Sequence, residues 1–273
     1  MENERKGAIC PVKVLKGGAH KFYPGCMYTT NEGYVVKVIE YVDYYHVLIE
    51  FIYNGFRTYG RMGDIINGSI KNPFHPNRYG GYFGVGPYDK NNHLRAYNTW
   101  IKMLERLTEE GQQNNYLRNR MYVNVSVCQE WYNYQNFACW YENYIGGLNT
   151  ELYNDYQIDK DILQWNQQYK IYSPTTCCLV PSYLNIMLSG RHSTRLHPEL
   201  PTGVTHRKGK DKYTATCDKK YVGDFNTPEE AFLAYKNQKE KNIKALADHY
   251  LSINAIHKDV YDALYKINII EGV

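Results

Sequence analysis

The sequence predicts an α+β fold built from separate blocks of short strands and amphipathic helices. Apolar residues alternate with a period of two near the N-terminus, and helical spacing of apolar residues dominates the middle of the chain. Three β-prone runs near the C-terminus lead directly into one capped amphipathic helix. We therefore expect a β-rich, barrel-like module at residues 1–88, an α+β middle domain at 89–190, a basic linker at 191–200, a three-stranded antiparallel sheet with a helix at 201–250, and a packing helix at 251–273.

The composition fits two or three compact units and excludes several classes of protein. Hydrophobic residues make up 43% of the 273 residues, and the formal net charge of +4 is only mildly basic. Seven cysteines form an odd set without Cys-x-x-Cys spacing, which argues against a disulfide framework and a zinc ribbon. The N-terminus lacks an apolar signal core, and no window holds the roughly 18 uninterrupted apolar residues of a membrane span. We expect a soluble, intracellular protein without a membrane partner.

The N-terminal block has the alternation and the turn of a small β module. Apolar residues alternate in Gly33–Glu40 and in His46–Tyr53, and an Asn54-Gly55 turn then leads into Phe56–Arg61 as in a hairpin. Several short strands of this kind favour a barrel-like unit. The string Gly68–Pro76 resembles the N-terminal module of phage endonuclease-like proteins, which has an SH3-like barrel. No chemistry is assigned to this module.

The middle domain begins with a helix and continues with mixed elements. Its apolar helical face comprises Leu94, Tyr97, Trp100, Ile101, Leu104 and Leu107. A polar stretch at Thr108–Arg120 predicts a surface loop, and Tyr122–Val127 alternates as a strand. Trp131–Tyr141 has helical spacing, and a polar turn around Asn166 precedes a short helix at Pro181–Leu188.

Four motifs of this domain occur in an order that resembles the HNH-like modules of phage homing-endonuclease-type proteins. They are Trp100, Met103, Leu104 and Arg106; Val127, Cys128, Glu130, Trp131, Gln135 and Phe137; Asp159 to Ile162; and Tyr172, Ser173, Pro174 and Cys177. The resemblance implies a DNA endonuclease that needs a histidine base and a divalent cation such as Mg²⁺. A phage-encoded protein of this type would act in the host cytoplasm.

The sequence departs from an active HNH centre at its base. Asp159-Lys160 stands where the active hairpin has an Asp-His pair, and the helix asparagine falls near Thr176. Asp159 and Asp161 are candidate magnesium ligands, and Lys160 is a candidate catalytic residue or phosphate contact. The alternative is that both aspartates cap a turn in a catalytically inactive fold.

The linker at Ser189–Pro198 carries two histidines and two arginines. His192 and His197 are alternatives for the missing base, but Gly190 and Pro198 favour a flexible connection. We expect Arg191 and Arg195 to contact DNA phosphates there.

The block after this linker predicts a complete sheet-and-helix module. Val204–His206, Tyr213–Cys217 and Tyr221–Phe225 read as three strands of an antiparallel meander. Thr227, Pro228 and Glu230 then form a capping box with proline at the first helical position. The following helix continues to about Tyr250, and apolar residues at helical spacing in Ser252–Ile270 predict a packing helix or an oligomer contact.

Positive charge concentrates in this block. Between Leu200 and Phe225, six basic residues against three acidic ones leave a local excess of +3, which attracts phosphates. Tyrosine is also abundant, with 29 residues, which fits either base stacking or a codon bias, so no single tyrosine is assigned a role.

The framework of the block resembles the Apetala-two/ethylene-response-factor DNA-binding domain. The matching residues are Gly203, Val204, Tyr213, Ala215, Gly223, Phe225, Thr227, Glu230, Ala231, Ala234 and Tyr235. The resemblance implies that the sheet lies in the major groove of double-stranded DNA. Together with the linker, the candidate DNA contacts are Arg191, Arg195, His206, Arg207, Lys208, Lys210, Lys212, Thr214, Thr216, Lys219 and Lys220. The alternative is a solvated basic sheet without a ligand.

These observations lead to one functional expectation with two alternatives. We expect a DNA-binding protein of the phage homing-endonuclease-like type with a degenerate nuclease centre. The alternatives are an active Mg²⁺-dependent endonuclease and a non-enzymatic structural or regulatory phage protein.

Overall fold

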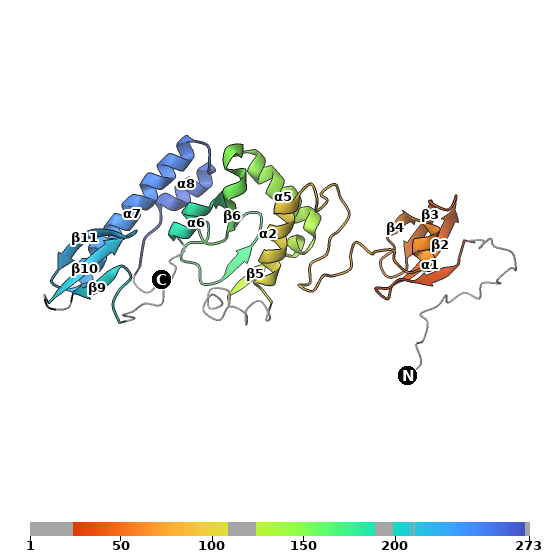
Figure 1. Ribbon diagram of the computed structural model, residues 1–273, viewed down its shortest axis with the longest axis horizontal. Helices are drawn as coiled ribbons and strands as arrows, with labels where there is room; N and C mark the ends of the chain where they lie inside the picture. Colours follow the sequence, from red (N-terminus) through yellow and green to blue (C-terminus); the bar gives the residue numbers. More distant parts are fainter. Residues whose placement is uncertain (1–23, 109–123, 189–198, 208, 210, 271–273) are drawn as a thin grey trace. The chain divides into compact units, whose positions relative to one another are not determined.

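The computed structural model describes residues 24–108, 124–188, 199–207, 209 and 211–270, and its fold class is α+β (Figure 1). The described chain divides into two compact units. The first comprises the residues up to Arg78 together with Tyr82–Val85, and the second comprises Tyr79–Gly81 and the residues from Gly86 onward. No helix in the described part of the chain is long and apolar enough to cross a membrane.

The first unit is a four-stranded antiparallel sheet with one short helix. The strands pair in chain order, with β1 and β4 at the edges. Val36, Val38, Val47, Ile49 and Phe51 point to one side of the sheet and form the core with Ile65 of the helix. The elements are β1 (Met27–Thr29), β2 (Val35–Tyr41), β3 (Val47–Phe51), β4 (Arg57–Gly60) and α1 (Met62–Ile66).

The predicted barrel-like module is instead an open sheet. Over the described residues it is open, because β1 pairs only with β2 and β4 pairs only with β3. Closing a sheet requires the edge strands to pair with each other. The alternation of apolar residues that predicted β2 and β3 shows only that one face of the sheet is buried. Open sheets and closed barrels both have such a face, so the pattern does not distinguish them.

The middle part of the second unit packs helices around an aromatic core. Helices α2 and α5 bury Trp100, Tyr134 and Phe137 together with Trp131. Trp131 belongs to a 3₁₀ turn, and α5 begins only after Asn133, whose side chain accepts a hydrogen bond from the N–H of Gln135. The helical elements are α2 (Leu94–Glu105), η1 (Gln129–Tyr132), α5 (Tyr134–Gly146), η2 (Thr150–Asp155) and α6 (Ser182–Leu188).

Two small sheets complete this part. Strand β5 (Val125–Val127) pairs in parallel with β7 (Lys170–Tyr172), and β6 (Tyr156–Asp159) pairs antiparallel with β8 (Cys178–Pro181). The sequence patterns did not predict β6, β7 or β8, since strands of three or four residues are too short to show a period.

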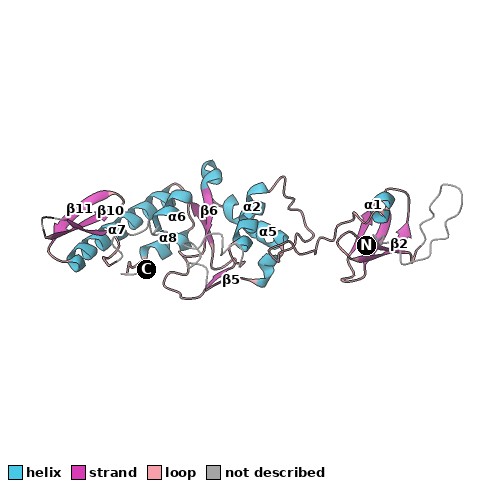
Figure 2. Ribbon diagram, turned by 60° about the horizontal axis from the view of Figure 1, so that its bottom comes forward, coloured by secondary structure: helices cyan, strands magenta, loops and turns pink. Residues whose placement is uncertain are grey.

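The C-terminal part has the predicted meander and capped helix. The three strands lie in the order β11-β10-β9, all antiparallel, and Figure 2 shows them beside the long helix α7. The side chain of Thr227 accepts from the N–H of Glu230, and Glu230 accepts from the N–H of Thr227, with Pro228 at the first turn. The elements are β9 (Val204–Arg207), β10 (Lys212–Cys217), β11 (Lys220–Phe225), α7 (Pro228–Ser252) and α8 (Lys258–Tyr265).

Helix α7 belongs to two hydrophobic cores. Its first half contributes Ala231, Phe232 and Tyr235 to a small core against the sheet. Its second half buries Ile243 and Ala247 in a larger cluster, to which the middle part of the unit and α8 also contribute. The other buried members of this cluster are Ile162, Cys178, Val180, Leu184, Ile256, Val260, Leu264 and Ile267. The sheet module therefore shares its helix with the core beside β6 and β8.

Candidate functional site

The sheet β9–β11 has one face on α7 and one face away from it. Along β10, Ala215 and Cys217 are buried and Tyr213 packs on the small core against α7. Successive side chains of a strand alternate between faces. Lys212, Thr214 and Thr216 therefore lie on the opposite face, which we call the outer face.

Strand β11 adds an acid and an aromatic ring to the outer face. Asp224 pairs with Thr214, whose hydroxyl donates a 2.6 Å hydrogen bond to the Asp224 carboxylate. Tyr221 pairs with Thr216 and is 65% exposed. Sequence reasoning missed Tyr221 because one tyrosine among 29 carries little information. The pairing of the two predicted strands across the turn, which places Tyr221 opposite Thr216, is the signal that could have identified Tyr221.

A tight turn joins β10 to β11 and is tied to α7. Asp218 and Lys219 both have positive φ, 49° and 65°, as a two-residue hairpin turn of type I′ requires. The Asp218 carboxylate accepts hydrogen bonds from Lys239 at 2.6 Å and from Asn242 at 2.8 Å. Burial raises the pKa of Asp218, but these two donors outweigh it and hold the pKa below its ordinary value. The anchored turn leaves Lys219 and Lys220 exposed.

Other predicted contacts lie elsewhere. His206 pairs with Tyr213, and the two ring centroids are 5.1 Å apart, so His206 lies on the α7 side of the sheet. Its Nε2 is 3.9 Å from the carboxylate of Asp211. The backbone of Arg207 pairs with Lys212. Outside the described residues are Arg191, Arg195, Lys208 and Lys210, the side chain of Arg207, and both linker histidines, His192 and His197.

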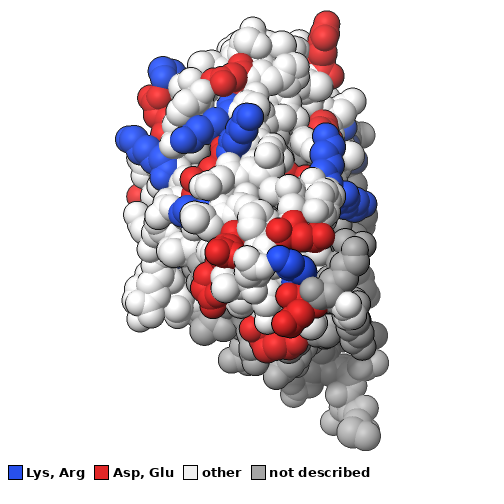
Figure 3. Space-filling view, turned by 90° about the vertical axis from the view of Figure 1, so that its left-hand side faces the viewer, with Lys and Arg blue, Asp and Glu red and all other residues white. Residues whose placement is uncertain are grey.

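The surface at this end of the unit carries both signs of charge. Figure 3 shows Lys and Arg side chains interspersed with Asp and Glu side chains. On the sheet itself, Lys212 donates to the side chain of Asn226, Lys219 lies in the turn, and Lys220 is the first residue of β11. The positive charge of the described sheet is therefore local to β10 and its turn.

Asp159 is the last residue of β6 and caps the turn that follows. Its Oδ1 accepts the N–H groups of Asp161 at 2.7 Å and Ile162 at 2.8 Å. The residue is buried, and burial, followed by the neighbouring charge of Asp161, raises the pKa of its carboxyl. Asp159 thus stabilises the local backbone.

Asp161 holds two lysines. Both of its oxygens are 2.9 Å from Nζ of Lys160, and Oδ1 is 2.5 Å from Nζ of Lys170. The Lys160 side chain is only 5% exposed, and that of Asp161 is 32% exposed. Burial raises the pKa of Asp161, but the two ammonium groups outweigh it, so the pKa lies below its ordinary value.

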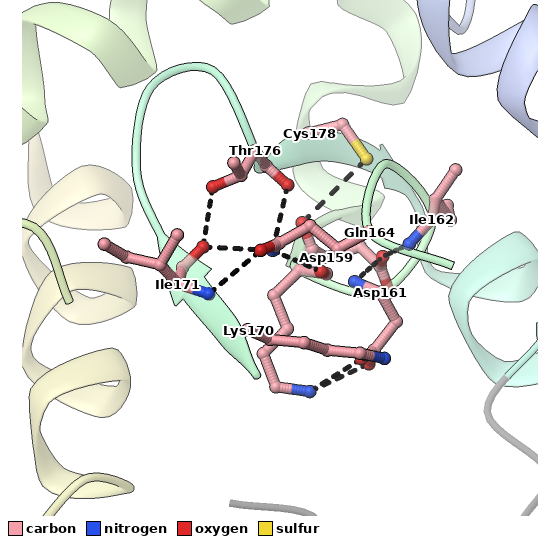
Figure 4. Close-up of polar contacts among 9 residues, drawn as sticks. Asp159, Asp161, Ile162, Gln164, Lys170, Ile171, Thr176 and Cys178 are labelled. Atoms are coloured by element: carbon pink, nitrogen blue, oxygen red, sulfur yellow. Dashed lines mark hydrogen bonds and ion pairs between the residues drawn. The ribbon is translucent and has the colours of Figure 1, made fainter. Parts of the chain in front are cut away.

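Gln164 links this turn to the next strand, as Figure 4 shows. Its buried side chain donates to the carbonyls of Lys160 at 2.8 Å and Ile171 at 3.0 Å, and accepts the N–H of Ile171 at 2.9 Å. Thr176, near the expected position of the helix asparagine, donates its hydroxyl to the Ile171 carbonyl at 2.6 Å. The polar groups of this centre therefore bind one another.

The two aspartates do not fit a magnesium site as they are placed. Their carboxylates point to different partners, Asp159 to backbone amides and Asp161 to ammonium groups (Figure 4). Within the described ranges, no group of three His, Cys, Asp or Glu side chains could hold a metal ion. Lys160 donates to both carboxylate oxygens of Asp161 and is engaged within the turn.

Comparison of the chain with models of protein families, with curated proteins and with solved structures finds no match. We therefore infer the chemistry of the candidate site from its own residues alone.

Proposed function

We propose that the chain binds double-stranded DNA through the outer face of the sheet β9–β11, as a protein of the phage homing-endonuclease-like type with a degenerate nuclease centre. The observation that supports this most is the sorting of side chains along β10. Lys212, Thr214 and Thr216 face away from α7, while Ala215 belongs to the core beneath them and Cys217 is buried. A β-ribbon with such a polar face has the dimensions to enter the major groove.

The anchored turn supports the same proposal. Lys219 and Lys220 are exposed at a turn that Lys239 and Asn242 hold to α7 through Asp218. Ion pairing of Asp218 with Lys239 also offsets one of the three acidic charges between Leu200 and Phe225. Phosphate contacts from these lysines would set the register of the sheet on the duplex. The exposed ring of Tyr221 lies where it can contact a base edge or a sugar.

The test is a comparison of two triple variants with equal net charge. The sheet variant replaces Lys212, Lys219 and Lys220 with alanine, and the control replaces three exposed lysines elsewhere, Lys71, Lys90 and Lys102. Binding to a labelled duplex of mixed sequence is measured by fluorescence anisotropy. We expect the sheet variant to lose about tenfold or more in affinity, because its phosphate contacts are removed.

The control variant should bind like the unchanged protein. Equal affinities for all three proteins, or an equal loss in both variants, would contradict the assignment to the sheet. Circular dichroism and thermal melting of each variant establish that the fold is retained.

Nuclease activity is not part of this proposal. The carboxylates of Asp159 and Asp161 are engaged by amides and by ammonium groups, which leaves them poorly placed to share a cation. Incubation of supercoiled plasmid with the protein and Mg²⁺ should leave the plasmid intact. Cleavage that Asp159→Ala abolishes would restore the endonuclease alternative.

A further inference from the structure

Asp224 and Thr214 bring two hydrogen-bond acceptors together on the outer face of the sheet. They pair across β10 and β11, and the Thr214 hydroxyl donates a 2.6 Å hydrogen bond to Oδ1 of Asp224. We propose that this pair reads the amino group of a cytosine in the major groove, which makes Asp224 a specificity-determining residue. The inference rests on the proposed binding of DNA by this sheet and names the base that the sheet prefers.

The backbone holds the Asp224 carboxylate in a defined place. Its neighbour Phe225 packs on the core under the sheet, so the exposed side chain of Asp224 lies on the opposite, outer face. Thr214 lies on β10, which is the central strand because it pairs with both β9 and β11. The strand pairing and the hydrogen bond together orient the carboxylate, and reading a base requires such a fixed geometry.

The pair offers acceptors and no donor to a ligand. An ionised carboxylate only accepts hydrogen bonds, and its two oxygens have about four acceptor positions, so Asp224 can accept a further donor beside Thr214. The Thr214 hydroxyl has a single hydrogen, which it donates to Asp224. Its remaining capacity is therefore to accept. A base that meets this pair has to supply a donor.

Cytosine is the base whose major-groove edge meets this requirement best. It presents the N4 amino group as a donor, whereas guanine presents the acceptors N7 and O6, and thymine presents the acceptor O4 and a methyl group. Adenine has an amino donor, but its N7 acceptor lies beside it. A carboxylate at this edge is thus attracted to cytosine and repelled by the acceptors of the other bases, and such repulsion contributes to specificity.

Other outer-face residues do not impose the same choice. Lys212 is a donor, which suits phosphates or guanine, and the exposed Tyr221 has a hydroxyl that can both donate and accept. The preference for an amino group therefore comes from Asp224 and Thr214. It concerns the ratio of affinities between sequences, because the negative charge of Asp224 weakens the binding of every duplex.

The experiment selects bound duplexes from a pool with a randomised central segment, using the full chain and the variant Asp224→Asn. For the unchanged protein we expect one position of the enriched sequences to be cytosine. In the variant this position should change to adenine. Asparagine keeps an acceptor for the Thr214 hydroxyl and adds an amide donor, and adenine is the base that an asparagine side chain binds through two hydrogen bonds. The other enriched positions should stay the same.

Two duplexes that differ only at this base pair give the size of the effect by fluorescence anisotropy. The unchanged protein should bind the cytosine duplex about fivefold or more tightly than the adenine duplex, and Asp224→Asn should reverse the order. Thr214→Val removes the hydroxyl that orients the carboxylate, so it should reduce the preference without reversing it. Asp211→Asn is the matched control, because it removes the same charge in the turn just before β10 and should keep the full preference for cytosine.

The outcomes separate this inference from DNA binding itself. Duplex binding without an enriched cytosine, or the same enriched base for the unchanged protein and Asp224→Asn, would overturn the inference and leave DNA binding by the sheet intact. An equal loss of preference in Asp211→Asn would overturn it as well. Absence of duplex binding by the unchanged protein would overturn both. Thermal melting of each variant establishes that the fold is retained.

Discussion

Asp161 is the residue of the candidate centre that pairs with two lysines. One carboxylate serves two ammonium groups, and Lys160 is almost completely buried. The Asp159-Lys160-Asp161 motif could be found in the sequence, but its geometry could not. The carboxylates of two aspartates two positions apart can point toward each other or apart. Here the turn after β6 directs the Asp159 carboxylate to the backbone amides of Asp161 and Ile162, away from the Asp161 carboxylate.

Replacing Asp161 with asparagine should destabilise the protein by about 3 kcal/mol. The variant leaves the Lys160 ammonium buried without its counter-charge, and breaking such pairs costs about 3–5 kcal/mol, with the lower end expected because Asp161 is partly exposed. Urea denaturation measures the change. Lys160→Met, which removes the buried charge itself, should cost less. Equal stability of Asp161→Asn and the unchanged protein would contradict the account of this pair.

The same ion pairs predict a pH dependence with a defined sign. Because the pKa of Asp161 is lowered in the folded state, its contribution is complete above the ordinary aspartate pKa of about 3.9 and is lost as pH falls toward the folded pKa. The stability difference between the unchanged protein and Asp161→Asn should therefore shrink between about pH 5 and pH 2.

Asp159 has the opposite behaviour, because its pKa is raised in the folded state. The unchanged protein should therefore gain stability relative to Asp159→Asn as pH falls. Unfolding curves at several pH values test both signs.

Asp224 provides a residue-scale test of the outer face. Its carboxylate lies beside Thr214 at the centre of the proposed interface, where it would repel DNA phosphates. Asp224→Asn should strengthen DNA binding by about 1 kcal/mol, or roughly fivefold. Anisotropy titration measures this, with Asp211→Asn in the turn just before β10 as a comparison. Unchanged affinity would argue that the duplex does not approach this face.

At the scale of elements, local signals were sufficient for some parts and insufficient for others. The capping box at Thr227 and the turn before β11 could be predicted because each depends on a few neighbouring residues. Pairing of β6 with β8 joins segments about 20 residues apart, and neither strand is long enough to show a pattern. The side of the sheet on which His206 lies could have been predicted. Side chains two positions apart on a strand point to the same face, and Val204 faces the core, so His206 faces it too.

Helix α7 should couple the sheet to the middle part of the second unit. Ile243 belongs to the buried cluster that contains Ile162 and Val180, whereas Ala231 on the same helix belongs to the core under the sheet. Ile243→Ala should cost about 2–5 kcal/mol and reduce amide exchange protection in both β8 and β10. Leu233→Ala, at an exposed position of α7, should cost much less. Loss of protection in β8 alone would contradict the coupling.

At the scale of the whole molecule, charge is distributed without a dominant sign. A net charge of +4 on 273 residues does not by itself predict a nucleic-acid partner, and Figure 3 shows both signs near the sheet. The proposal therefore depends on where the lysines of β10 and its turn lie, and not on their number. The alternation of β10 indicates that Lys212 shares a face with Thr214 and Thr216, whereas the tie between Asp218 and α7 required the folded chain.

The most direct test of DNA binding by the sheet is the salt dependence of duplex affinity. Each phosphate contact adds about 0.9 to the slope of log affinity against log salt concentration. The slope of the unchanged protein should exceed that of the Lys212, Lys219 and Lys220 triple alanine variant by about 2–3, and should equal that of the charge-matched control. Identical slopes for the unchanged protein and the sheet variant, measured from low to physiological salt, would contradict the claim that the outer face binds DNA.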